Sequence, residues 1–179
     1  MGYIPRGLPP AKYIRECFYY DPLAGALTWR VRPLSHFPNR ATNQRWNTRF
    51  AGKRAGYNRK DGYQAVGINN MPCLIHRVIW IWMTGGEAYN DVDHVNLNRS
   101  DNRWSNLRLA DRSQNSVNSP KHVDNTTGYK GVSKYLNKFG ARIWLNGKEV
   151  YLGTFDTPQE AHKAYCDAAK APHGVFFHP

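Results

Sequence analysis

The chain of 179 residues has few cysteines, few acidic residues and no long apolar segment. Its three cysteines, Cys17, Cys73 and Cys166, are odd in number and far apart, which excludes a disulfide framework and a zinc site built from paired cysteines. The longest apolar run, Val78 to Met83, is far shorter than the roughly 18 residues of a transmembrane helix. The first residues lack the features of a secretory signal. We therefore expect a cytoplasmic protein of one or two domains without a membrane partner.

The shortage of acidic residues is uneven along the chain. Lys and Arg number 25 against 13 Asp and Glu, a formal net charge of +12. Residues 1–60 hold 12 basic and two acidic side chains, residues 61–120 hold five and six, and residues 121–179 hold eight and five. Strong positive charge together with 13% aromatic residues favours a partner that carries phosphates and flat bases. The weakly acidic middle third would suit a divalent cation.

Arginine dominates the basic first third, where it accounts for nine of the twelve basic residues. Its planar fork suits phosphate, so residues 1–60 are expected to bind the nucleic-acid backbone. The alternative is a solvated basic arm without a fixed partner, which the interleaved aromatic residues disfavour. The expected contacts in this region are Arg30, Arg32, Arg45, Arg49 and Arg54.

Local patterns predict short elements throughout the first 118 residues. Residues 33–60 are rich in Arg, Asn and Gly and are expected to be irregular. Periodicity, turn residues and capping residues predict the remaining elements, which are a helix over 11–20, a strand over 26–31, a hairpin of strands 63–68 and 71–75 around Asn69-Asn70, an apolar helix over 76–83 closed by Gly85-Gly86, strands at 92–94 and 107–110, and a helix over 111–118 capped by Asp111 or Ser113.

Residues 91–115 combine a carboxylate, a histidine and several asparagines. Carboxylate and amide oxygens are hard ligands suited to Mg²⁺ or Mn²⁺, and a neutral histidine can take a proton from water. These are the groups that phosphodiester hydrolysis requires. Neighbours in a strand point to opposite faces, so Asp93 and His94 can share a site only if the strand ends or twists there.

Asp93-His94, with Asn106 and Asn115 following it, resembles the HNH (ββα-metal) endonucleases, in particular the phage homing type. The resemblance extends upstream to Tyr20-Asp21-Pro22 and Gly25. It implies that His94 is the general base, that Asp93 and Asn115 hold one Mg²⁺ or Mn²⁺, and that Asn106 orients the loop and the histidine. The paired-cysteine zinc site that some HNH relatives use as a scaffold is absent from this sequence, so we expect no zinc, and we also expect no small-molecule cofactor.

Several polar residues near this motif have open roles. Four are more often turn formers than ligands and are left out of the site, namely Asn96, Asn98, Asp101 and Asn102. Arg99, Arg103 and Arg108 either touch phosphate or solvate the loop. For Arg77 a phosphate contact, which we include among the candidate sites, and an ordinary surface position are about equally favoured.

Residues 129–179 form a second unit after a polar linker at 119–128. Asn146-Gly147 predicts a two-residue turn in a hairpin over 141–152, with Ile143 opposite Val150. One face of that hairpin is apolar, and the other is aromatic and charged. Thr157-Pro-Gln-Glu160 predicts a capping box that starts a helix covering the apolar face.

This segment resembles the ethylene-response-factor (Apetala-two) DNA-binding domain, through Gly128-Tyr-Lys-Gly-Val-Ser, Trp144 and the run from Tyr151 to Tyr165. The resemblance implies three antiparallel strands packed on one helix, with the exposed sheet face in the DNA major groove. The contacts it implies are Lys130, Ser133, Tyr135, Arg142, Trp144, Glu149 and Tyr151. A purely structural role for that face is the alternative.

Together these features predict an α+β chain with a basic DNA-binding region at 1–60, an HNH core at 61–118, a linker at 119–128 and an Apetala-two-like domain at 129–179. The predicted function is that of a site-specific, metal-dependent endonuclease of the homing type acting on double-stranded DNA, with a monomer favoured. The alternatives are a non-catalytic DNA-binding regulator and an RNA-processing nuclease.

Overall fold

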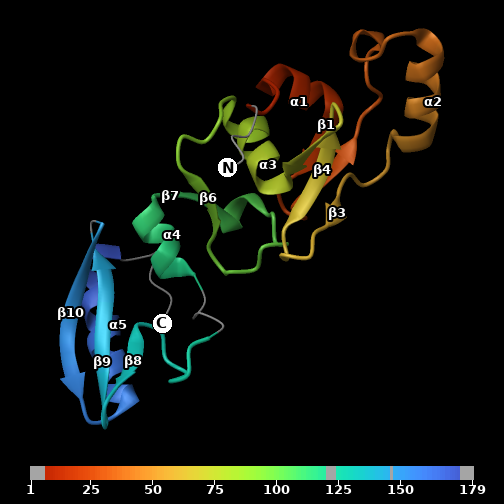
Figure 1. Cartoon of the computed structure of the whole chain (residues 1–179). Helices are drawn as coiled ribbons and strands as arrows, with labels where there is room; N and C mark the ends of the chain where they lie inside the picture. Colours follow the sequence, from red (N-terminus) through yellow and green to blue (C-terminus); the bar gives the residue numbers. More distant parts are fainter. Residues whose placement is uncertain (1–6, 120–123, 146, 174–179) are drawn as a thin grey trace. The chain divides into compact units, whose positions relative to one another are not determined.

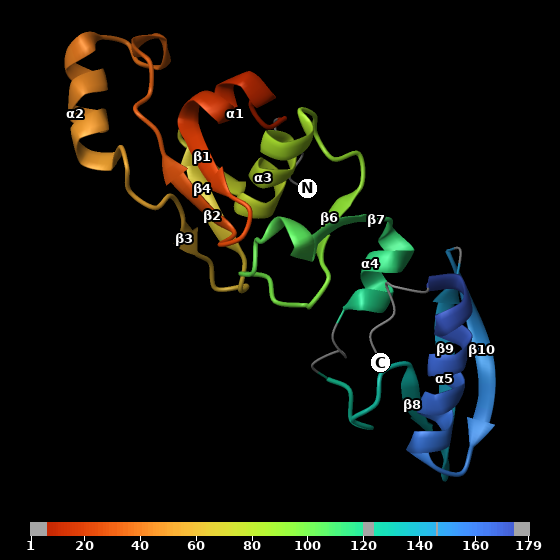
Figure 2. The same ribbon diagram turned by 180° about the vertical axis from the view of Figure 1, so that it is seen from behind.

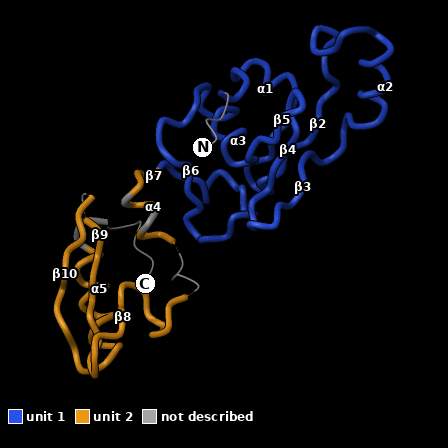
Figure 3. The backbone as a smooth tube through the Cα atoms, in the orientation of Figure 1, with its two compact units in different colours: residues 1–109 blue, residues 110–179 orange. Residues whose placement is uncertain are grey.

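The computed structural model describes residues 7–119, 124–145 and 147–173, and it has the mixed α+β architecture that the sequence predicts (Figures 1 and 2). The chain divides into two compact units, residues 1–109 and 110–179 (Figure 3). Across the described ranges, none of the helices is both long and apolar enough to span a membrane.

The described part of the first unit contains short helices and three small sheets. Two sheets are two-stranded, β1-β2 and β6-β7, and the third has the order β3-β4-β5. Its elements in chain order are α1 (Ala11–Cys17), β1 (Phe18–Asp21), β2 (Ala26–Trp29), the 3-10 helix η1 (Leu34–His36), α2 (Arg40–Phe50), β3 (Tyr57–Asn58), β4 (Gln64–Ile68), β5 (Met71–Leu74), α3 (Ile75–Thr84), β6 (Asp91–His94), the 3-10 helix η2 (Trp104–Asn106) and β7 (Leu107–Ala110), whose last residue belongs to the second unit.

A single hydrophobic core joins distant parts of the first unit. Helices α1 and α3 pack side by side, as both ribbon views show (Figures 1 and 2). The core contains Ile14 and Phe18 from the basic first third together with Val66, Val78 and Leu107 from the central third. Residues on both sides of position 60 therefore stabilise the same unit, and the separation of binding and cutting regions at that position stays a prediction.

The helix predicted over residues 11–20 is wrong in its second half. Helix α1 ends at Cys17, and Phe18–Asp21 forms strand β1, which pairs with β2. Burial alternates along this strand, with Phe18 and Tyr20 buried and Tyr19 exposed. This is the period of a strand, and the three adjacent aromatic residues favour it. Strand β2 ends at Trp29, two residues earlier than predicted.

The expectation of irregular structure over residues 33–60 is also wrong, because these residues include helix α2. Asn39 caps the helix by accepting a hydrogen bond from the Thr42 backbone N–H at 2.9 Å. Trp46 and Phe50 are one turn apart, with ring centroids 5.1 Å from each other, and Trp46 also packs edge-on against Trp29 at 4.8 Å. A cap and two aromatic anchors thus outweigh a polar composition.

The other predicted elements of this unit are confirmed. Asn69 and Asn70 both have positive φ, 50° and 61°, and they connect β4 to β5 as a tight turn of the expected kind. Helix α3 is closed by Gly85 in the left-handed region at φ 86°, where glycine has no Cβ to strain. Strands β6 and β7 lie where the sequence places them.

The described residues of the second unit form a helix followed by three strands and a longer helix, in the sheet order β10-β9-β8. Helix α5 packs on this sheet, as predicted. The elements are α4 (Arg112–Asn118), β8 (Val132–Tyr135), β9 (Lys138–Leu145), β10 (Lys148–Phe155) and α5 (Pro158–His173). Residues 120–123 of the predicted linker and Asn146 of the predicted turn lie outside the described residues.

The predicted register of this hairpin is confirmed, with Ile143 opposite Val150 and a β-bulge after Tyr151. The capping box is confirmed as well. The Thr157 N–H donates to Glu160 Oε2 and the Glu160 N–H donates to Thr157 Oγ1, both at 3.2 Å. The buried faces of sheet and helix meet through small residues, among them Ala141 and Ala161, which let the two elements approach closely.

Candidate active site and nucleic-acid interface

Asp93 and His94 are the last two residues of β6, and both are buried, with 8% and 4% of their surface exposed. The strand ends at His94, which removes the geometric conflict expected for neighbours in a longer strand. A polar loop, residues 95–106, then leads to β7, and the Val95 N–H donates to the carbonyl of Asn106 across its base at 2.9 Å.

The His94 ring is held by a chain of side-chain hydrogen bonds. Nε2 lies 3.2 Å from Asn102 Oδ1, and Asn102 Nδ2 donates to Gln64 Oε1 at 3.0 Å. Gln64 Nε2 in turn donates to Asn58 Oδ1 at 3.1 Å. The Asn102 amide nitrogen donates to Gln64, so the Asn102 oxygen is the atom that accepts from His94. The imidazole proton is therefore on Nε2, and the lone pair is on Nδ1.

Burial is the main influence on the basicity of His94. It lowers the pKa of the ring below the ordinary histidine value, while the hydrogen bond to Asn102 and the charge of Asp93 act in the opposite direction. The ring is therefore neutral at neutral pH, and a neutral imidazole is the form that can accept a proton.

A second buried histidine, His76 on α3, packs edge-on against His94 with ring centroids 5.0 Å apart. Tyr63 lies beside both rings, at 5.3 and 6.0 Å. The buried Nδ1 of His76 has no hydrogen-bond partner among the described residues. Burial, together with the neighbouring His94, lowers the pKa of His76 to about 3. The His94 ring therefore packs against two uncharged rings, those of His76 and Tyr63.

This burial predicts a specific acid sensitivity. Between pH 6.5 and 3 the unfolded chain protonates residue 76 and the folded chain does not, so the free energy of unfolding falls as pH falls. Between pH 6.5 and 5 the loss from His76 is about 2 kcal/mol. We expect His76→Phe, measured by chemical denaturation at both pH values, to lose less stability than the wild type. An equal loss in both proteins would contradict the shift.

Asp93 is paired with Arg108 of β7, whose Nε lies 3.0 Å from a carboxylate oxygen. Both side chains are largely buried, so each compensates the charge of the other. Asn115, the second predicted ligand, lies on α4 in the second unit. Asp111 caps that helix, because its Oδ1 accepts from the Gln114 N–H at 2.8 Å. In the described ranges no cluster of three or more His, Cys, Asp or Glu side chains is placed to hold a metal ion.

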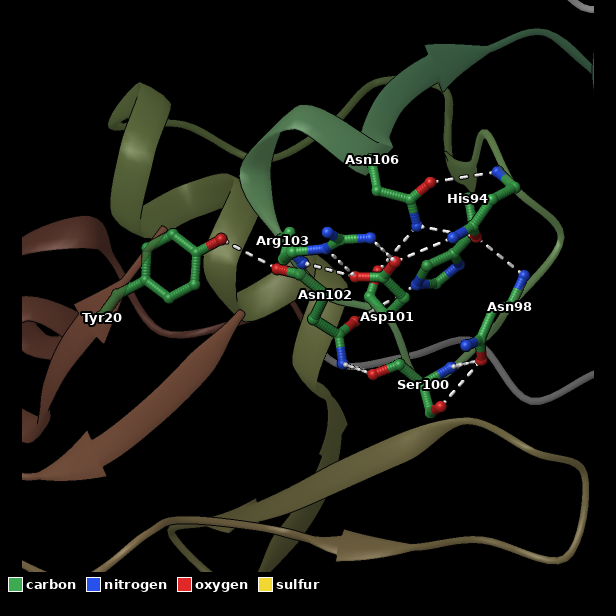
Figure 4. Close-up of polar contacts among 9 residues, drawn as sticks. Tyr20, His94, Asn98, Ser100, Asp101, Asn102, Arg103 and Asn106 are labelled. Carbon is green, nitrogen blue, oxygen red and sulfur yellow. Dashed lines mark hydrogen bonds and ion pairs between the residues drawn. The ribbon is translucent and has the colours of Figure 1, made fainter. Parts of the chain in front are cut away.

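Asn106 fixes the loop between the two strands (Figure 4). Its Oδ1 accepts from the Asn96 N–H at 3.0 Å, and its Nδ2 donates to Asn96 Oδ1 at 3.0 Å and to the Asp101 carbonyl at 2.8 Å. The contact with the His94 ring comes instead from Asn102. The sequence argument assigns Asn102 to a turn, and nothing local signals its role, because its partner Gln64 is 38 residues away.

The segment containing β1 and the turn between β1 and β2 packs against the same loop. The Tyr20 hydroxyl donates to the Asn102 carbonyl at 2.8 Å, and the Trp104 N–H donates to the Pro22 carbonyl at 3.2 Å. Gly25 has φ 65°, and a Cβ there would lie 2.5 Å from the Arg103 backbone nitrogen. Packing against the loop thus explains why this upstream segment accompanies the Asp93-His94 motif.

The predicted DNA-binding arginines of the first unit differ in exposure. Arg30, Arg45, Arg49 and Arg54 are exposed and Arg77 is half-buried, with its guanidinium donating to the Ala88 carbonyl. Arg32 is only 7% exposed. Its guanidinium carbon lies 4.8 to 6.0 Å from four aromatic rings, and its Nε donates to His36 at 3.2 Å. The geometry of Arg32 is that of a core residue, whereas the exposed arginines can reach a phosphate.

Because Arg32 is buried and Arg45 is exposed, replacing each by alanine should have a different effect. We expect Arg32→Ala to lower the free energy of unfolding by ~3 kcal/mol, because it removes buried cation–π contacts and leaves hydrogen-bonding groups unpaired. Arg45→Ala should leave stability unchanged and weaken DNA binding, with a shallower salt dependence. Denaturant titration and gel shifts at several salt concentrations measure the two effects. Loss of DNA affinity in a fully stable Arg32→Ala protein would contradict the assignment.

Six of the seven contact positions predicted in the second unit are exposed on the sheet, and they are Ser133, Tyr135, Arg142, Trp144, Glu149 and Tyr151. A Cβ built on Gly140 would lie within 4.0 Å of Ser133, Tyr135 and Tyr151, so residues from all three strands share one face. Lys130 behaves differently. It is half-buried, and its Nζ donates to the carbonyls of Val117 and Ser119 at the end of α4.

Comparison with known proteins identifies the class of the central segment. Residues 73–117, which run from β5 to α4, match the family described as HNH endonuclease. The chain thus carries an HNH endonuclease domain in this region.

The chain is also 32% identical over 108 residues to an uncharacterised HNH endonuclease of Acanthamoeba polyphaga mimivirus. That alignment covers 59% of this chain and 56% of the viral protein. No solved structure matches.

Proposed function

We propose that the protein is a metal-dependent, site-specific DNA endonuclease of the homing type. The observation that carries the proposal is the state of His94. It is buried and neutral, and it is oriented by Asn102 within the segment that matches HNH endonucleases. A histidine in this state is suited to general-base catalysis.

In this proposal His94 takes the proton from the attacking water. Its Nε2–H is committed to Asn102 Oδ1, so Nδ1 is the atom that accepts the proton. The neighbouring carboxylate of Asp93 then favours the charged ring that results. Asn106 keeps the loop folded, and with it the backbone that carries Asn102.

A divalent metal fits the chemistry of the predicted donor set. Asp93 supplies a carboxylate and Asn115 an amide oxygen, both hard ligands that Mg²⁺ or Mn²⁺ prefers. The ion would polarise the phosphate and the leaving oxygen when bound. Arg108 offsets the charge of Asp93 in its buried position, with its Nε 3.0 Å from a carboxylate oxygen.

Substrate binding is assigned to two exposed surfaces. The exposed arginines of the first unit, including Arg45 and Arg49 on α2, would hold the phosphate backbone. The exposed face of the β8-β9-β10 sheet, with Arg142 and Trp144, would read the major groove of the target, as in the Apetala-two-like domains that it resembles. Products with a 3′-hydroxyl and a 5′-phosphate are expected, and a monomer with one active site favours nicking.

The test is cleavage of a plasmid that carries the DNA flanking the gene, in the presence of Mg²⁺, with the cut mapped on each strand. A discrete cut at one site supports the proposal. The second candidate, a non-catalytic DNA-binding regulator, predicts a footprint at one site without a cut. The Asp93–Arg108 pair and the His94 chain disfavour it, because binding alone does not need a buried, oriented histidine.

A further inference from the structure

Arg99 lies in the loop that follows His94, and its side chain is exposed but held in one position. Its guanidinium carbon lies 4.8 Å from the centre of the Tyr63 ring, and one of its N–H groups donates to the Asp61 carbonyl at 2.9 Å. Its aliphatic part lies over Gly62, where a Cβ would be 3.7 Å from Arg99 Cδ. A hydrogen bond and a cation–π contact thus hold the Arg99 guanidinium in place.

The surface that holds Arg99 is itself rigid. Asp61 is paired with Arg59 at 2.9 Å, and it accepts a hydrogen bond from the Tyr63 N–H. Tyr63 continues into the buried cluster with its ring 6.0 Å from that of His94. Tyr63 therefore contacts the exposed Arg99 guanidinium on one side and lies near the His94 ring of the proposed active site on the other.

The lack of a carboxylate partner distinguishes Arg99 from three neighbouring arginines. Arg59, Arg103 and Arg108 each form an ion pair with an aspartate. Within the described residues Arg99 forms no ion pair with a carboxylate, and its recorded polar partner is a neutral carbonyl. A guanidinium that is oriented but not neutralised is a preformed site for an anion, and its planar fork matches a phosphate.

We infer that Arg99 binds the phosphate group at which the DNA strand is cut, with Tyr63 as the residue that positions it. This inference rests on the proposed nuclease function and deepens it. It assigns Arg99 to the reacting group, whereas the arginines of α2 hold the backbone elsewhere. A contact with the reacting phosphate gains strength as negative charge develops there, so Arg99 should act on the rate of cutting.

The experiment measures single-turnover cleavage of a duplex containing the mapped site, at enzyme concentrations that saturate binding. We expect Arg99→Ala to lower the saturated rate about 100-fold, and Arg99→Lys to lower it less, because lysine keeps the charge without the planar fork. Arg103→Ala, a variant in the same loop, should cut at close to the wild-type rate.

Tyr63→Leu provides the test of positioning. It should lower the saturated rate, and adding it to Arg99→Ala should cause little further loss, because both changes remove the same interaction. Thermal unfolding of each variant confirms that it is folded. A saturated rate for folded Arg99→Ala equal to that of Arg103→Ala would overturn the inference. Failure of the wild type to cut any DNA would overturn the proposed function instead.

Discussion

Replacing His94 by alanine is expected to abolish cleavage of target DNA and to leave DNA binding nearly intact. A general base contributes roughly 10²- to 10⁴-fold to the rate, and no other described side chain is both oriented by Asn102 and adjacent to Asp93. The arginines and the sheet face assigned to DNA binding are separate from this ring, so affinity should depend little on it. Cleavage assays and gel shifts on the same duplex measure the two quantities.

The informative control is Asn102→Leu, which leaves the imidazole in place but removes the oxygen that accepts its Nε2–H. We expect a loss of rate smaller than that of His94→Ala, with DNA affinity again retained. Thermal unfolding reports whether each variant is folded, which matters because His94 and Asn102 are buried. Retained cleavage by His94→Ala would contradict the general-base role, and parallel loss of binding would indicate a structural one.

The sequence predicts best where the determining contacts are local. The Asn69-Asn70 turn, the capping box from Thr157 to Glu160 and the hairpin register are each fixed by residues within a few positions of one another. Helix α2 is not predicted because one of the contacts that stabilise it is not local. Helix α2 is stabilised partly by Trp46 packing on Trp29, 17 residues earlier, and composition alone gives no sign of that contact.

The candidate site divides in the same way. The Asp93-His94 pair and the spacing to Asn106 and Asn115 can be read from the sequence, because the residue types carry the chemistry. Which neighbour holds the histidine cannot, because Asn102 acquires its role only when β4 brings Gln64 beside the loop. The sequence also does not reveal which arginines are exposed. Arg32 and Arg45 have the same side chain, but only Arg32 is enclosed by aromatic rings.

Removing divalent metal is expected to have an effect as large as removing His94. EDTA should stop cleavage completely, and Mg²⁺ or Mn²⁺ added in excess should restore it, because the proposed ligands are oxygen atoms that prefer such ions. DNA binding should persist in EDTA, since the exposed arginines and the sheet face do not depend on the ion. Cleavage that continues in EDTA would contradict a metal-dependent mechanism.

Two variants of Asp93 separate its metal role from its pairing with Arg108. Asp93→Ala leaves the largely buried Arg108 without its carboxylate partner, and breaking such a pair costs about 3–5 kcal/mol, so this variant should lose both activity and stability. Asp93→Asn still offers Arg108 an oxygen of similar geometry but lacks the negative charge that binds a cation. We expect it to remain better folded than Asp93→Ala and to require a higher Mn²⁺ concentration for half-maximal cleavage. If Asp93→Asn cuts with the wild-type dependence on Mn²⁺, Asp93 is a structural partner of Arg108 and the ion is held elsewhere.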